Sequence, residues 1–277
     1  MRVQKGLIVV MTLFAMPAFA GAVYDLEIKN LVSGEVKTGK ISIEGGNLKI
    51  ASPAVTDKRS ADVIYRSSKR EALLIDHAGK SFVVMDEAGM QAMGAQMSEG
   101  MRMLEEQMKN MPPEQRDAMR KMMQERGMAG GMPGSQPARE VKVVKGGPVS
   151  MRGQSGVQYD MFVNGEKTVE YWTTSPGKLR GGAELYALAK EMSGFFEKGM
   201  GPMMNSMRDA GANPYDVLDR LDGNLPFFTR RYQGGKAVEE SFFGAGRDEN
   251  IAASEFEPPP GYKKREMPKG PMGQPRK

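Results

Sequence analysis

Hydrophobic and polar residues alternate in short segments along the first third of the chain. In the segment VYDLEIKN, Tyr24, Leu26 and Ile28 lie on one side of an extended chain and mostly polar residues lie on the other. This period of two is typical of a half-buried β-strand. Similar segments follow, separated by polar or glycine-rich turns: KISIE, NLKIA, ADVIYR, EALLID and SFVVMD. The pattern predicts six strands in an antiparallel meander between residues 23 and 86.

The spacing of the apolar residues changes from two to three or four after Asp86. The residues at this spacing form one stripe along a helix: Met90, Met93, Met97, Met101, Leu104, Met108 and Met111. Pro112 and Pro113 end this helix and begin a second one, because proline is tolerated in the first turn of a helix but not in its interior. The second helix ends in the glycine-rich segment GMAGGMPG. The pattern predicts a Met-rich helical hairpin inserted at residues 87–134.

Alternation returns after this insertion and then gives way to a helical period once more. The segment GVQYDMFVNGEKTVEYWTT holds Asn164-Gly165, which favours a two-residue hairpin turn because both positions need positive φ. Apolar residues recur at helical spacing over residues 182–208, and a second hairpin is expected around Gly234-Gly235. This order of elements predicts a single α+β domain over residues 21–262, in which helices cover one face of an antiparallel sheet.

The two ends of the chain differ from this domain. Residues 1–20 combine two basic residues, an apolar run and small residues at Ala18 and Ala20, which is the pattern of a cleaved secretory signal peptide. The run is shorter than the roughly twenty apolar residues of a membrane-spanning helix, so we expect no transmembrane segment. Residues 263–277 are basic and rich in proline and glycine, which predicts a disordered tail. We expect an exported protein, located in the periplasm or secreted.

The net charge of +5 comes from the ends of the chain. Without the signal peptide and the basic tail, residues 21–262 carry a net charge of −2. The high isoelectric point is therefore a property of the tail, and an exported protein seldom meets nucleic acid, so we expect no nucleic-acid partner. The chain has no cysteine, which leaves packing and hydrogen bonds to stabilise it.

Few residues of the chain suit catalysis. His77 is the only histidine and lies in the expected tight turn IDHAGK, so sites that need two imidazoles are excluded. No nucleophile elbow, phosphate-binding loop or dinucleotide fingerprint occurs in the sequence. Adjacent carboxylates such as Glu105-Glu106 and Glu239-Glu240 point in different directions along a helix or strand. We expect no enzymatic activity, no catalytic residue, no metal site and no cofactor.

Methionine is concentrated in the two predicted helical regions. Of the 22 methionines after residue 20, 18 lie between Met85 and Met132 or between Met192 and Met207. Three interpretations remain open. The stripes could pack on the sheet as an adaptable covering layer, they could bind varied apolar partners, or their thioethers could bind Cu(I), which prefers soft ligands.

Three segments carry a resemblance to a known family: ISIEGGNLKIA, LLIDHAGKSFVVMDEAGM and FEPPPGYKK. They resemble a family of exported bacterial proteins that contain a domain of unknown function. That family is in turn similar to the LolA-like superfamily of periplasmic lipoprotein carriers. The resemblance implies an incomplete, strongly curved antiparallel barrel whose concave apolar face is covered by helices, and it implies no catalytic residue.

A carrier of this kind needs no catalytic group, so we expect a non-enzymatic protein that binds an apolar ligand or an acylated partner between the sheet and the helices. The expected contacts come from both Met-rich regions: Met97, Met101, Leu104, Met108, Met192, Phe195 and Phe196. The alternative is a scaffold or assembly protein that docks a protein partner through its Met-rich helices. A Met-rich copper-binding protein is a third alternative.

Overall fold

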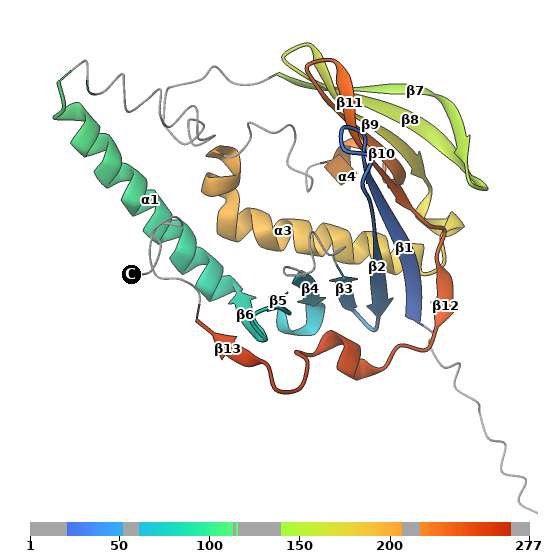
Figure 1. The fold of residues 1–277 in the computed structure, drawn as a ribbon, viewed down its shortest axis with the longest axis horizontal. Helices are drawn as coiled ribbons and strands as arrows, with labels where there is room; N and C mark the ends of the chain where they lie inside the picture. Colours follow the sequence, from blue (N-terminus) through green and yellow to red (C-terminus); the bar gives the residue numbers. More distant parts are fainter. Residues whose placement is uncertain (1–20, 52–60, 113–114, 116–139, 207–216, 267–277) are drawn as a thin grey trace, which may run out of the picture.

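One continuous β-sheet is the main element of the part of the chain that the structure describes (Figure 1). The computed structural model describes residues 21–51, 61–112, 115, 140–206 and 217–266, and within these ranges thirteen strands belong to the sheet. Their bounds are β1 (Gly21–Asn30), β2 (Val36–Glu44), β3 (Asn47–Ala51), β4 (Ala61–Arg66), β5 (Glu71–Asp76), β6 (Ser81–Asp86), β7 (Val141–Met151), β8 (Gln154–Val163), β9 (Glu166–Thr174), β10 (Leu225–Gln233), β11 (Lys236–Phe243), β12 (Arg247–Glu249) and β13 (Lys263–Arg265).

The sheet joins two strand groups that are far apart in the sequence. The first strand group is β1 to β6, and the second strand group is β7 to β11. The spatial order is β13-β6-β5-β4-β3-β2-β1-β11-β10-β9-β8-β7, and β12 pairs with β1 beside this path. The joint is the antiparallel pair of β1 and β11, in which Leu26 is opposite Phe243. Strand β13 pairs in parallel with β6 at one end of the order, and β7 lies at the other end.

The strands follow from the local pattern of the sequence. The six strands expected between residues 23 and 86 are β1 to β6. The hairpin expected at Asn164-Gly165 is confirmed between β8 and β9, where φ is 52° at Asn164 and 82° at Gly165. The hairpin expected at Gly234-Gly235 is confirmed between β10 and β11, and both glycines have positive φ.

Three α-helices occur within the described residues: α1 (Glu87–Lys109), α3 (Gly182–Ser206) and α4 (Val217–Arg220). Each lies between strands, and α4 is a single turn. None of these helices is both long and apolar enough to cross a lipid bilayer.

The expected fold class, an α+β domain with a curved, incomplete barrel covered by helices and a Met-rich helical hairpin insertion, is wrong. Among the described residues strands outweigh helices, and the large sheet is open. Helix α1 is present, whereas the second half of the expected hairpin lies outside the described residues except for residue 115. Local periodicity identifies single hairpins but not the distant pairing of β1 with β11, which merges two strand groups into a sheet too large for the three described helices to cover.

Helix α3 crosses one face of the sheet, which we call the inner face (Figure 1). The side chains buried between them form one cluster, which includes Tyr24, Ile43, Leu48, Tyr65, Leu185, Leu188, Phe195 and Phe196. Burying each large apolar side chain contributes about 1.5–3 kcal/mol. Glu191 on α3 accepts hydrogen bonds from the Tyr65 hydroxyl at 3.1 Å and the Ser67 hydroxyl at 2.7 Å. These contacts fix α3 to the first strand group.

The opposite, outer face is closed over the first strand group by residues 250–262, which we call the outer strap. Ile251, Phe256 and Tyr262 of the outer strap pack on a buried cluster of Val23, Ile64, Leu73 and Ile75. Lys49 holds the strap through an ion pair with Glu255 at 2.8 Å. Arg66 pairs with Glu257 in the same way. The strap therefore completes a second hydrophobic core on the side away from α3.

Candidate functional site

Helices α1 and α3 contact each other and carry the ligand contacts expected from the sequence. Phe195 is 5% exposed and Phe196 is 7% exposed, and the ring centroid of Phe195 lies 5.7 Å from that of Tyr65 on β4. Met192 is partly buried against the same cluster. These three side chains on α3 fill the space between the helix and the inner face. Their role in binding a ligand stays a prediction.

The expected contacts on α1 are only partly described. The side chains of Met97, Met101, Leu104 and Met108 lie outside what the structure describes. Met90, near the start of the helix, is fully buried in the inner-face cluster. Figure 1 shows α1 running from β6 past α3 and away from the sheet. Met103, which lies off the apolar stripe, is 59% exposed, so this side of α1 faces solvent.

A polar cluster that sequence reasoning missed lies on the outer face of the second strand group and extends onto β1. The strand registers place two rows of side chains side by side across β8, β9, β10, β11 and β1. The first, which we call the aromatic row, consists of Gln158, Trp172, Phe228, Phe242 and Glu27. The second, which we call the charged row, consists of Asp160, Glu170, Arg230, Glu240 and Lys29.

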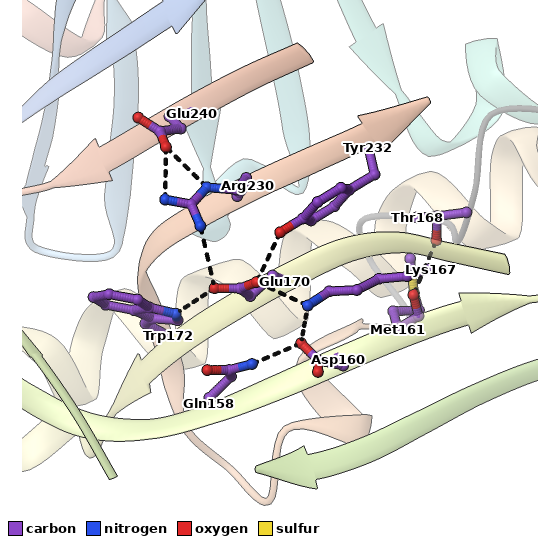
Figure 2. Close-up of polar contacts among 10 residues, drawn as sticks. All are labelled: Gln158, Asp160, Met161, Lys167, Thr168, Glu170, Trp172, Arg230, Tyr232 and Glu240. Atoms are coloured by element: carbon purple, nitrogen blue, oxygen red, sulfur yellow. Dashed lines mark hydrogen bonds and ion pairs between the residues drawn. The ribbon is translucent and has the colours of Figure 1, made fainter. Parts of the chain in front are cut away.

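Glu170 lies at the centre of the charged row (Figure 2). Its side chain is 8% exposed, and its Oε1 accepts a hydrogen bond from Trp172 Nε1 at 2.8 Å. Its Oε2 accepts hydrogen bonds from Lys167 Nζ at 2.8 Å and from the Tyr232 hydroxyl at 2.9 Å. Arg230 lies 3.8 Å from the same carboxylate. Two cations and two neutral donors thus surround one nearly buried anion.

These contacts set the protonation states of the cluster. Burial raises the pKa of the Glu170 carboxyl, but the hydrogen bonds from Lys167, Trp172 and Tyr232 outweigh burial, and the net pKa is below its ordinary value. Burial lowers the pKa of Lys167, but its hydrogen bonds to Asp160 and Glu170 outweigh burial and raise the pKa. The cluster therefore keeps its ion pairs at neutral pH.

The turn between β7 and β8 closes over one end of the aromatic row. Arg152 in this turn donates hydrogen bonds to both carboxylate oxygens of Glu27, at 2.8 and 3.2 Å. Its guanidinium also lies 4.4 Å from the ring centroid of Phe242. A depression of about 270 Å³ lies beside it. The lining residues are Glu27, Lys29, Met151, Arg152, Phe228, Glu240, Ser241 and Phe242.

Ion pairs hold the side chains of this polar cluster in place. Its carboxylates are paired with cations, as in the contact of Lys167 with Asp160 at 2.8 Å and of Arg230 with Glu240 at 2.8 Å. From the sequence, Glu240 was only one of two adjacent carboxylates that point in different directions along a strand. The alternation of Glu170 and Trp172 along β9 was a signal, but their neighbours on other strands become known only from the register.

His77, the only histidine of the chain, lies under the outer strap and away from both clusters. Its Nε2 is 3.1 Å from the Asp62 carboxylate, and its Nδ1 is 2.9 Å from the Tyr262 hydroxyl. Both ring nitrogens are occupied by contacts within the protein. These contacts link the strap to β4 and to the turn after β5.

Comparison with known proteins gives little further information. The chain matches no family model and no curated protein. Among solved structures it is similar to the crystal structure of an uncharacterized conserved protein from Thermus thermophilus, with 5% sequence identity and a TM-score of 0.42. That match covers 88% of this chain and 90% of the other chain. We draw no functional conclusion from a likeness at this level.

Proposed function

We propose that this is a non-enzymatic, periplasmic binding protein that holds the acyl chain of a lipid or of an acylated partner along helices α1 and α3. The course of α1 carries the proposal. The helix begins in the inner-face core at Met90, contacts α3 and continues to Lys109. A helix that leaves its core while keeping an apolar stripe is well suited to an apolar ligand.

The helical period supplies the apolar surface. Met97, Met101 and Leu104 continue the stripe that starts at Met90, because residues three and four apart lie on the same side of a helix. Each such side chain contributes about 1.5–3 kcal/mol when it is covered. Methionine is unbranched and flexible, so it adapts to an acyl chain of variable shape.

Two matched substitutions on one turn of α1 test the proposal. M101E places a carboxylate on the apolar stripe, and M103E places the same group at a position that is 59% exposed and lies off the stripe. A fluorescent long-chain fatty acid should bind the mature protein saturably. We expect M101E to weaken binding at least tenfold and M103E to leave it unchanged.

The proposal fails if the wild-type protein takes up no fatty acid saturably, or if both variants lose binding equally. Near-ultraviolet circular dichroism of both variants checks that each keeps the native packing. Because the two substitutions introduce the same charge into the same helix, a difference between them reports on the stripe itself.

A further inference from the structure

The outer face of β8 to β11 and β1 is a polar and aromatic surface that the described elements leave accessible. Trp172 and Phe242 are both partly exposed, and the side chains of Arg230 and Glu240 are 30% and 26% exposed. The outer strap packs on the other strand group, over Val23 and its neighbours on β4 and β5. A dissolved molecule can therefore contact Trp172 and Phe242 of the aromatic row and Arg230 and Glu240 of the charged row, whereas Phe228 is 3% exposed and the Glu170 side chain is 8% exposed.

The charges of this surface cancel. Its anions are Glu27, Asp160, Glu170 and Glu240, and its cations are Lys29, Arg152, Lys167 and Arg230. Binding of nucleic acid or of an anionic membrane depends on an excess of lysine and arginine. A surface without that excess favours a neutral ligand.

The two rows offer complementary chemistry. The aromatic row supplies the partly exposed rings of Trp172 and Phe242, while the ring of Phe228 between them is buried and packs on Trp172 at a centroid distance of 4.9 Å. The charged row supplies carboxylates and a guanidinium, which form strong, charge-assisted hydrogen bonds. A sugar ring has an apolar face of C–H groups and hydroxyl groups around its edge. It can therefore contact the aromatic row with its face and the charged row with its hydroxyls.

We propose that the aromatic and charged rows form a binding site for a neutral saccharide. The depression beside Arg152 has a volume of about 270 Å³, slightly below the roughly 300–1,000 Å³ of pockets for drug-sized ligands. It suits one sugar ring, and further rings of an oligosaccharide lie along the rows. The site is on the face opposite α3, so it is independent of acyl binding by α1 and α3.

The fluorescence of Trp172 reports on this site directly, because Trp172 is the only tryptophan of the chain. The mature protein is titrated with maltotetraose, cellotetraose and chitotetraose, with glycerol at the same hydroxyl concentration as the control. We expect a saturable change in emission with at least one tetrasaccharide and none with glycerol. The absence of a saturable change with all three sugars overturns the proposal.

Three variants locate the binding. F242A removes a ring from the aromatic row and should weaken saccharide binding at least tenfold. Gln158→Leu removes the amide at the opposite end of the row and gives an independent test if F242A does not fold. V32A, at a turn position that is 80% exposed and outside both rows, should bind like the wild type.

The proposal is wrong if Gln158→Leu and a folded F242A bind the sugar as tightly as the wild type. It is also wrong if a DNA oligonucleotide or anionic phospholipid vesicles change Trp172 emission saturably while the sugars do not. The acyl-binding assay on the same variants separates the two proposals, because F242A should leave fatty-acid binding unchanged.

Discussion

The two halves of the sheet's outer face cover their apolar side chains in different ways. Over β1, β4 and β5, the outer strap closes the face, and its Phe256 is only 3% exposed. Over β8 to β11, charged side chains lie over some of the rings instead, and Trp172 and Phe242 stay partly exposed. Arg230 lies 5.3 Å from the ring centroid of Phe228, and Lys167 lies 5.0 Å from that of Tyr232.

The half under the strap therefore contributes mainly to the stability of the fold, and the half with the two rows stays accessible to other molecules. The strap half is a core, and its contribution is apolar burial. In the other half, long side chains cover the rings with their stems while their charged heads stay near water. We therefore expect substitutions under the strap to lower the stability of the protein most, and substitutions in the rows to lower stability less while changing what the surface binds.

The largest expected effect is that of F256A. Removing a buried phenylalanine side chain should lower the free energy of unfolding by about 3–5 kcal/mol, because the transfer energy of the ring is lost and a cavity remains. Urea denaturation measures the change. V32A, at an exposed turn, is the control and should stay within about 0.5 kcal/mol of the wild type. A loss below about 1 kcal/mol for F256A would show that the strap is not part of the core.

The next largest effect is expected for Glu170→Gln. The amide replaces a carboxylate oxygen by a donor facing Lys167 or Tyr232, which should lower the free energy of unfolding by about 2 kcal/mol. The pKa of Glu170 is lower in the folded protein than in the unfolded chain, so its contribution is present above about pH 4 and is lost as the pH falls further.

Urea titrations of the wild type and of Glu170→Gln between pH 7 and pH 3 measure this effect. The difference between the two proteins should be largest at neutral pH and should shrink in acid. A difference that does not depend on pH would contradict the assignment of an ionised Glu170 at the centre of the row.

Tyr171 follows Glu170 on β9 and lies on the opposite face of the sheet, and it should give the free energy of unfolding the opposite pH dependence. It packs against the inner cluster around Tyr159 and Met161, and burial raises the pKa of its hydroxyl to about 12. The neutral form of Tyr171 is therefore favoured in the folded protein. The contribution of Tyr171 to the stability of the protein is fully present below about pH 10 and is lost as the pH rises toward the folded pKa. At pH 11 the wild type should have lost about 1 kcal/mol more than Y171F. Identical alkaline unfolding curves would contradict this.

The smallest effect is expected for R152A. The Arg152 side chain is 51% exposed and its partner Glu27 is 36% exposed, and exposed ion pairs contribute about 1 kcal/mol or less. Thermal unfolding should therefore show only a small decrease in Tm. A loss above about 2 kcal/mol would show that the turn between β7 and β8 is held as tightly as a core element.

Local sequence patterns explain the strands, the tight turns and the helix α3. Alternation identified β1 to β6, and Asn164-Gly165 identified a hairpin turn, because both depend on neighbouring residues. The pairing of β1 with β11 depends on residues at opposite ends of the chain. No local period encodes that pairing, and this is why the fold class was wrong.

The two candidate sites also differ in how far the sequence predicts them. Phe195 and Phe196 were found from helical spacing, and both lie against the sheet as that spacing requires. The contact of Glu170 with Arg230 and Tyr232 joins two strands that are separated by α3 and α4 in the sequence. A charged residue in a strand pattern indicates a solvated position unless the register is known, so the sequence could not show this cluster.

Native mass spectrometry of the protein, purified without detergent from the cells that produce it, tests the central claim most directly. We predict a mass in excess of the denatured chain that matches an acyl lipid and that M101E loses while M103E keeps. A bare mass, together with no uptake of added fatty acid, would contradict acyl binding by α1 and α3.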